Sequence, residues 1–240
     1  MPTVTARAGV AAKSETSNFA VAQPTLGQFT LSAFAAGLEV PCSLELAEDA
    51  PLFQDAVLDD AVSGFLEYEE NLFINGSGSG QAQGLLGNVG SGVTDEPDTN
   101  GNPVSILATW NVLSTVKASY QKGASWLMQQ NTAIAIRKAQ VGSNLFEPVF
   151  RRENGIDLLH GFPVAYSSQM PAAARGNCAA LFGNFAQGYV IGDRGGPALI
   201  LKVLNQAGMQ QGIVNLLFYR RVDGRVRAAE AIQSLTIAAS

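Results

Sequence analysis

Residues 49–76 read DAPLFQDAVLDDAVSGFLEYEENLFING, and they carry the clearest structural pattern in the chain. Apolar side chains recur in it at every third or fourth position, which is the spacing of one helix face: Phe53, Val57, Ala61, Phe65, Tyr68 and Leu72. Asp49 can cap the first turn, and Pro51 fits there because its missing N–H is not needed. Asn75 and Gly76 form a good stop signal. The pattern predicts a long helix over residues 44–74.

The other faces of this helix are acidic, and they carry Asp59, Asp60, Glu67, Glu69 and Glu70. The last three lie near the C-terminal end, where the helix dipole disfavours negative charge and where they repel one another. Arginines of another subunit would relieve this repulsion, so these five acids are candidate subunit-interface residues. A solvated acidic face is the alternative interpretation.

Charge is unevenly distributed along the chain. Between Lys13 and Lys117 there is no lysine or arginine, and this window holds 14 of the 20 acidic residues. Opposite fields on one molecule favour head-to-tail contacts between copies, which close into rings or shells or run on as filaments. The basic candidates for such contacts are Arg151 and Arg152, or the cluster of Arg220, Arg221, Arg225 and Arg227. The alternative is that the two halves neutralise each other inside one fold.

The composition also favours association. Apolar residues make up 47% of the chain and charged residues 15%, against about 25% charged residues in an ordinary domain. Partner subunits would cover the apolar surface that follows from so little charge. No apolar run is long enough to cross a bilayer, and no secretory signal is expected at the N-terminus.

The motifs of catalysis and metal binding are missing from the sequence. The glycine-rich run 76–80 lacks the lysine of a phosphate-binding loop. Cys42 and Cys178 have no metal-ligand spacing and are interpreted as buried thiols. His160 is the single histidine; it could form a triad with Asp157 and a serine, but its apolar turn favours a structural role. These features point to a structural, self-assembling protein.

The flanking segments complete the prediction. Residues 1–40 have no helical period and are interpreted as an extended arm, and residues 76–102 as a long loop that is functional or covered. Near the C-terminus, Asp223 and Gly224 predict a two-residue hairpin turn between strands 216–222 and 225–232.

Several blocks, in order, resemble one known family. Residues 38–49, LEVPCSLELAED, resemble the segment that leads into the long spine helix of tailed-bacteriophage major capsid proteins of the Hong Kong 97-like family. FINGSGSGQAQGLL (73–86) is similar to that family's glycine-rich signature after the helix. WLMQQNT (126–132), LHGFPV (159–164), QMP (169–171), FGNFAQGYVIGDR (182–194) and RVDGRV (221–226) are similar to further family blocks.

The resemblance implies an α+β fold with a peripheral domain, an axial domain and an extended loop. It assigns residues 1–40 to the N-terminal arm or extended loop, 41–100 to the peripheral domain with its spine helix, 101–214 to the axial domain, and 215–240 to return strands of the peripheral domain. It also implies that a scaffolding segment is missing ahead of the arm.

The function that the resemblance implies is a phage or prophage major capsid protein. Such a protein assembles through pentamers and hexamers into an icosahedral shell around double-stranded DNA, which it contacts non-specifically, with no enzyme activity, cofactor, metal or membrane. Its main partner is itself, and scaffold, protease, portal and decoration proteins are further partners. It resides in the virion and assembles in the bacterial host cytoplasm. Two other functions remain open: an encapsulin-like shell around protein cargo, and a small hydrolase that uses His160.

Overall fold

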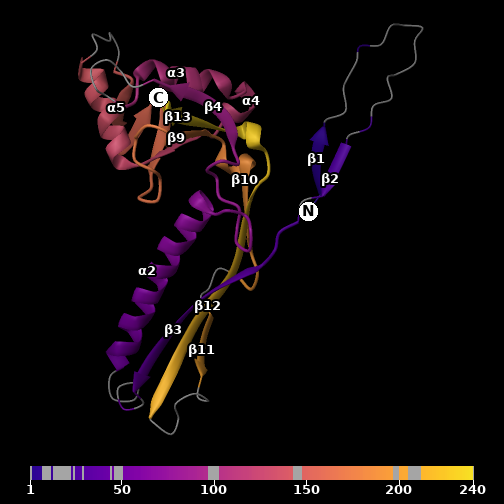
Figure 1. Cartoon of the computed structure of the whole chain (residues 1–240), viewed down its shortest axis with the longest axis vertical. Helices are drawn as coiled ribbons and strands as arrows, with labels where there is room; N and C mark the ends of the chain where they lie inside the picture. Colours follow the sequence, from indigo (N-terminus) through magenta and orange to yellow (C-terminus); the bar gives the residue numbers. More distant parts are fainter. Residues whose placement is uncertain are drawn as a thin grey trace. The chain divides into compact units, whose positions relative to one another are not determined.

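The computed structural model describes residues 2–6, 12, 23, 25–28, 30–43, 45, 51–96, 103–142, 148–196, 200–204 and 212–239. The chain divides into two compact units, Met1–Ser32 and Ala33–Ser240. In the first unit, β1 (Pro2–Ala6) pairs antiparallel with β2 (Thr25–Gln28), so two strands of the N-terminal segment form a ribbon (Figure 1).

A four-stranded sheet in the second unit is built around one long strand, β12 (Ile213–Val226). The strands β3 (Phe34–Ser43), β10 (Tyr189–Asp193) and β11 (Ile200–Leu204) all pair with β12 in antiparallel orientation. The expected arm of residues 1–40 therefore ends inside β3, whose order comes from hydrogen bonds to β12 of the same chain. The long strand and its partners are visible side by side in Figure 1.

The predicted C-terminal hairpin is wrong. Asp223 and Gly224 lie inside β12, opposite Gly192 and Ile191 of β10. Glycine is needed at 224 because a Cβ there would collide with the hydroxyl of Tyr189. The Asp-Gly pair thus marks a close approach of a ring to the backbone and not a turn.

The helix α2 (Pro51–Asn75) covers one face of this sheet (Figure 1). Its predicted stop at Gly76 is confirmed, whereas the cap at Asp49 and the side chain of Phe53 lie outside the described residues. Ala61 and Phe65 pack on Leu216 and Phe218 of β12, and Leu72 packs on Val222. The predicted apolar stripe is confirmed at these positions.

Tyr68 is an exception, because it is 45% exposed. The next helix position, Glu69, turns toward the sheet in its place and is buried. The sheet presents Arg220 at this point, so a polar partner decides which side chain the helix buries there.

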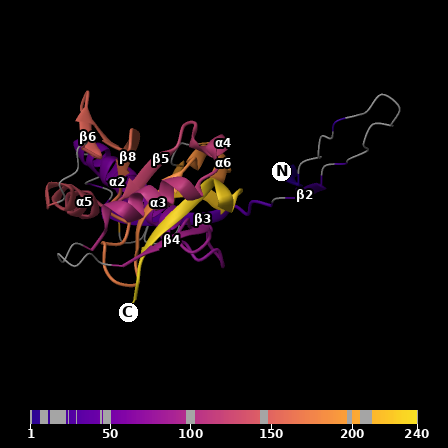
Figure 2. The ribbon, with the colours of Figure 1, turned by 90° about the horizontal axis from the view of Figure 1, so that it is seen from above.

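The second sheet of this unit has seven strands. Their order is β4 (Gly90–Asp95), β13 (Ile232–Ile237), β9 (Cys178–Gly183), β5 (Ser125–Met128), β8 (Phe162–Tyr166), β7 (Ile156–Leu159) and β6 (Phe150–Glu153). Helices α3 (Ile106–Thr115) and α5 (Gln130–Gly142) pack on one face, over a core that includes Trp126 and Phe182 (Figure 1 and Figure 2). Short helices α4 (Ala118–Gln121), α6 (Phe185–Gly188) and η2 (Ala229–Ala231) connect the strands.

The C-terminal residues are shared between the two sheets. β12 returns to α2 as expected for residues 215–226, but β13 inserts between β4 and β9 of the seven-stranded sheet. The expected grouping of residues 215–240 with α2 therefore applies to β12 alone.

The glycine-rich segment after α2 folds back on the helix end. The N–H of Leu85 donates to the carbonyl of Phe73 at 2.9 Å, and the N–H of Gln83 donates to the carbonyl of Gly224 at 2.8 Å. Leu85 is buried against Ile74 and Ile232. This part of the expected long loop is thus covered by the chain's own core.

Candidate subunit-interface residues

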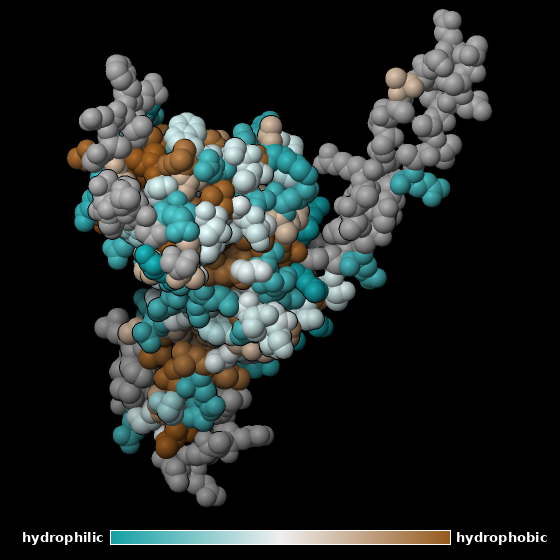
Figure 3. Space-filling model, turned by 45° about the horizontal axis from the view of Figure 1, so that its top comes forward, coloured by the Kyte–Doolittle hydropathy of each residue, from teal (hydrophilic) through white to brown (hydrophobic). Residues whose placement is uncertain are grey.

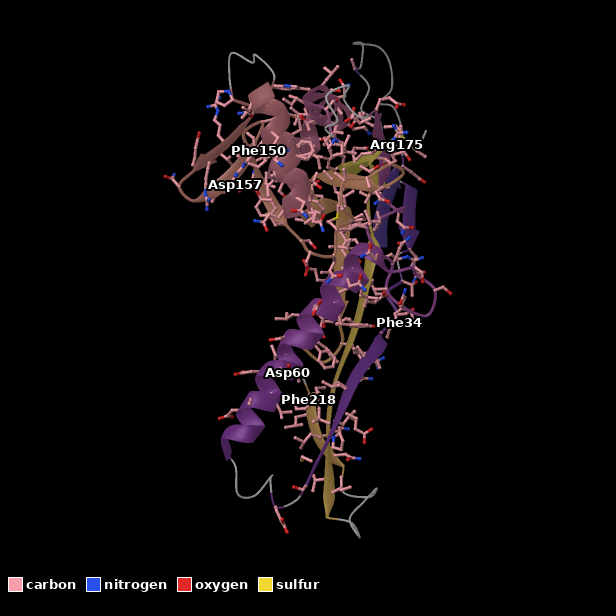
Figure 4. The ribbon with its side chains drawn as sticks, turned by 60° about the vertical axis from the view of Figure 1, so that its left-hand side comes forward. Phe34, Asp60, Phe150, Asp157, Arg175 and Phe218 are labelled. Atoms are coloured by element: carbon pink, nitrogen blue, oxygen red, sulfur yellow. The ribbon has the colours of Figure 1, made fainter. Side chains whose placement is uncertain are left out.

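The acidic candidates on α2 separate into exposed and buried side chains. Asp59, Asp60 and Glu67 are exposed, on the side of the helix away from the four-stranded sheet, and we call these three the acidic helix face. Glu70 is half-buried. Figure 4 labels Asp60 on α2 and Phe218 on β12, which mark the helix layer and the sheet layer. Since α2 contains no lysine, arginine or histidine, the acidic helix face has no cation of its own helix beside it.

Glu69 does not belong to that surface. Its side chain is 8% exposed, and Nη1 of Arg220 lies 2.9 Å from its carboxylate. The same guanidinium donates to Asp193 of β10, with Nη2 2.7 Å from Oδ2. The prediction that Glu69 meets an arginine of another subunit is therefore wrong: its partner is Arg220 of its own chain.

Burial raises the pKa of the Glu69 carboxyl, and the nearby charge of Arg220 opposes that rise without cancelling it. The three charged groups join α2, β10 and β12 at one point. Removing one member would leave a charge without its partner in a poorly solvated place, which is costly. The cluster thus holds the two layers of this part of the subunit together.

The arginines of β12 lie on both sides of the sheet. Side chains alternate along a strand, so Arg221 and Arg225 point away from α2, whereas Arg220 points toward it. Lys202 of β11 lies on the same side as Arg221, since it sits opposite Leu217 and its Nζ is 5.3 Å from the Tyr219 ring. We call Lys202, Arg221 and Arg225 the basic sheet face.

Two carboxylates, those of Glu39 and Asp223, lie on the same side of the sheet, where the exposed cations Lys202 and Arg225 outnumber the exposed anion Glu39. Glu39 accepts a hydrogen bond from Asn215 at 2.7 Å, and Asp223 is buried. Arg227 follows the end of β12 and is exposed, while its N–H donates to the carbonyl of Gly188. The acidic helix face and the basic sheet face therefore lie on opposite sides of one two-layer structure.

Arg151 and Arg152 are exposed on the edge strand β6. Nε of Arg151 donates to the carbonyl of Pro148 at 3.0 Å, and Nε of Arg152 is 3.8 Å from Asp157. Asp157 accepts stronger hydrogen bonds from Tyr166 at 2.5 Å and from Arg137 at 2.6 Å. These partners, Tyr166 first, lower the pKa of Asp157. Figure 4 shows Asp157 and Phe150 together at this end of the sheet.

His160 has the structural surroundings that its apolar turn predicts. Its Nε2 is 2.7 Å from the hydroxyl of Thr109, and its ring lies 4.0 Å from the Trp110 ring, centroid to centroid. Burial lowers the pKa of His160 to about 4. The carboxylate of Asp157, its imagined triad partner, is engaged with Arg137 and Tyr166.

Within the part of the chain that the structure describes, no group of three or more histidine, cysteine or acidic side chains is arranged to hold a metal ion. Over the same residues, no helix is long and apolar enough to span a membrane.

Comparison with known proteins gives a consistent result. A sequence model of the phage capsid family matches residues 1–237. No curated protein matches the chain significantly. Among solved structures, the capsid of an empty GTA particle computed with C5 symmetry has a TM-score of 0.85 at 23% identity, over 99% of this chain and 84% of that chain.

Two further structures have the same fold at lower identity. A chain of Gordonia phage Cozz has a TM-score of 0.67 at 15% identity, over 100% of this chain and 81% of that one. The holo-SrpI encapsulin complex from Synechococcus elongatus PCC 7942 has a TM-score of 0.66 at 18% identity, over 91% of this chain and 77% of that one. The expected Hong Kong 97-like capsid fold is confirmed by these matches.

Proposed function

The chain belongs to the phage capsid family, and on that premise we propose that it is a major capsid protein that assembles through pentamers and hexamers into an icosahedral shell enclosing double-stranded DNA. The observation that carries the proposal is the family match over residues 1–237, which takes in both compact units. The role is structural and needs no cofactor.

The charged surfaces support head-to-tail contacts between copies. The acidic helix face and the basic sheet face lie on opposite sides of the subunit, so one copy can offer positive charge where the next offers negative charge. We assign Asp59, Asp60, Glu67 and Glu70 to one side of such contacts, and Arg151, Arg152, Arg221, Arg225 and Arg227 to the other. Each exposed pair is worth only about 0–1 kcal/mol, but a shell repeats it many times.

The regions of the subunit then take different roles. The segment Met1–Ser32 is the extended loop, α2 with the four-stranded sheet is the peripheral domain, and the seven-stranded sheet with α3 and α5 is the axial domain. Scaffold, protease, portal and decoration proteins are further partners, contact with packaged DNA is non-specific, and assembly takes place in the bacterial cytoplasm.

Electron microscopy of the purified full chain tests the proposal. We expect closed shells in negative stain and, from a host that supplies packaging, double-stranded DNA that resists added nuclease until the shell is opened. Particles that enclose protein and no DNA would favour the alternative function, an encapsulin-like shell. The similarity to an encapsulin structure is the observation behind this alternative. A chain that stays monomeric at every salt concentration would refute a shell function of either kind.

A further inference from the structure

Two asparagine–glycine pairs in the described part of the chain have opposite surroundings. The sequence contains three such pairs, at 75–76, 100–101 and 154–155, and the second lies outside the described residues. Asparagine followed by glycine is especially prone to spontaneous loss of the side-chain amide, because glycine has no side chain to hinder the attack of its own backbone nitrogen. Whether a pair reacts in the folded protein depends on how its backbone is held.

The pair of Asn75 and Gly76 is held from several sides at the end of α2. The N–H of Gly76 donates to the carbonyl of Leu72 at 2.9 Å. The side-chain amide of Asn75 donates to Asn71 at 2.8 Å and to the carbonyl of Gln169 at 3.0 Å. Gly76 is buried, and a Cβ on it would collide with two carbonyl oxygens. The nitrogen that would attack is thus already hydrogen-bonded, and the amide that would be attacked is fixed.

Asn154 and Gly155 form the two-residue turn between β6 and β7. Glu153 pairs with Ile156 as the last pair of the hairpin, and the φ angles of 51° and 82° at the two turn residues are of the kind that Asn-Gly turns favour. All four residues are exposed, and a Cβ on Gly155 would meet open space. Figure 4 shows this hairpin projecting from the sheet beside Asp157. Because exposed tips open more easily than elements tied to a core, the Asn154 side chain can reach the Gly155 nitrogen at small cost.

We propose that Asn154 is a site of spontaneous deamidation in the folded protein, whereas Asn75 is protected. The backbone nitrogen of Gly155 loses its proton and attacks Cγ of Asn154; the new N–C bond forms, the bond from Cγ to the amide nitrogen breaks, and ammonia leaves. Water then opens the resulting five-membered imide at one of its two carbonyl carbons, which gives aspartate or isoaspartate. The net change is one water taken up and one ammonia released, so water is the only co-reactant.

Either product changes the end of the β6–β7 hairpin. Each adds a carboxylate close to Arg151 and Arg152, which are exposed candidates for contacts between copies. Isoaspartate also lengthens the main chain by one CH2 group. A hairpin whose loop length fixes the pairing register cannot take up an extra backbone atom without opening at its tip. The reaction depends on the turn alone, so the inference goes beyond the proposed shell function and does not rest on it.

The test follows both pairs in the full chain during incubation in mildly alkaline buffer, where more of the attacking amide nitrogen is deprotonated. Peptide mapping by mass spectrometry reports residues 75 and 154 in separate peptides, and a protein-isoaspartate methyltransferase with a labelled methyl donor reports isoaspartate. We expect the folded chain to convert Asn154 at least about tenfold faster than Asn75, because more than one net hydrogen bond must break at Asn75 and Gly76 before attack. In urea, where neither pair is held, the two rates should be similar.

The variants Gly155→Ala and Gly161→Ala separate the reaction from strain in the turns. The two glycines have φ angles of 82° and 80°, and a Cβ on either would meet open space. Gly161 follows His160 and not an asparagine, so it is the matched control. An alanine side chain at 155 hinders the attack, so Gly155→Ala should lose most of the conversion at Asn154, while Gly161→Ala should keep it.

Three results would overturn the inference. The first is a folded chain that converts Asn75 as fast as Asn154. The second is a folded chain in which Asn154 stays unconverted over a time in which it converts in urea, because the turn would then be closed to the reaction. The third is equal conversion at Asn154 in the two alanine variants, because the attack would then not pass through the nitrogen of residue 155.

Discussion

The two parts of the larger unit use different chemistry on their surfaces. The layer of α2 and the four-stranded sheet exposes Asp59, Asp60 and Glu67 on one side, and on the other it exposes Lys202 and Arg225 beside the half-buried Arg221. On the seven-stranded part, the ten residues of α3 include no charged side chain, and Leu107 and Trp110 of that helix are exposed. Figure 3 shows hydrophobic side chains, in brown, on the outside of the molecule where α3 and α5 lie. Charged contacts weaken with salt and apolar contacts do not. The comparison therefore predicts that one molecule carries a salt-sensitive and a salt-insensitive contact.

The largest effect is expected in the core of the α2 layer. Phe65 is 8% exposed and packs with Leu216 and Phe218, so Phe65→Ala should lower the free energy of unfolding by about 3–5 kcal/mol. Glu67→Ala, on the exposed side of the same helix, should change it by about 0.5 kcal/mol or less. Urea titration of dissociated subunits measures both variants. Equal midpoints would contradict the assignment of Phe65 to the buried face of α2 and of Glu67 to the exposed face.

Arg220→Ala should have the next largest effect, because it leaves Glu69 and Asp193 without their shared cation. Breaking a buried ion pair costs about 3–5 kcal/mol, and we expect about 3 kcal/mol here because 18% of the Arg220 side chain is exposed. Arg194→Ala, which removes an exposed arginine next to Asp193, is the control and should change the free energy of unfolding by about 0.5 kcal/mol or less. Urea titration of dissociated subunits measures both variants.

This loss should depend on pH. The pKa of Glu69 is raised above its ordinary value of 4.5 in the folded protein, so its ionisation destabilises the fold as pH rises through that window. Without Arg220 the penalty for an ionised Glu69 is greater. The difference between variant and wild type should therefore shrink as pH falls toward 4.5, and a difference that is the same at pH 7 and pH 4.5 would contradict this account.

A smaller effect is expected from His160, which belongs to the seven-stranded part. Its folded pKa of about 4 lies below the ordinary 6.5, so the unfolded chain takes up a proton first as pH falls. Stability that is present above pH 6.5 is lost between pH 6.5 and 4. Since the ring is only partly buried, we expect about 1 kcal/mol of this loss between pH 7 and 5.

The variant His160→Gln should lack that part of the pH dependence. It should be less stable than the wild type at pH 7, because the packing on Trp110 is weakened, but its stability should fall less on acidification. Chemical denaturation at both pH values measures the two slopes, and parallel profiles would mean that His160 does not titrate in this range.

The smallest effect per subunit is expected at the acidic helix face. Glu67→Lys should leave the stability of a dissociated subunit unchanged, while a single exposed pair contributes about 0–1 kcal/mol to assembly. Light scattering at low salt should show a higher protein concentration required for assembly, and the difference should disappear at high salt. A difference that persists at high salt would place Glu67 in an apolar contact instead.

Much of the fold follows from local patterns in the sequence. The period of α2 and its stop at Gly76 depend on neighbours in the chain, so composition and spacing identify them. The predicted hairpin at Asp223 and Gly224 is wrong because the sequence cannot distinguish a glycine that is needed for a turn from a glycine that is needed beneath the ring of Tyr189. The exposed apolar side chains of α3, Leu107 and Trp110, had a signal in the sequence, because the ten residues of this helix include no charge. Which side of the helix is exposed depends on what packs beneath it.

The long helix, the uneven charge and the resemblance to capsid proteins follow from the sequence, because periodicity, composition and ordered blocks are properties of the chain alone. The burial of Glu69 against Arg220, the exposure of Glu67, and the opposite directions of Arg220 and Arg221 on β12 become visible only once the chain is folded. Adjacent residues of like charge are nearly equivalent in a sequence. They differ once a strand and a helix pack together, because the register of that packing places one side chain against a buried partner and leaves the other in water.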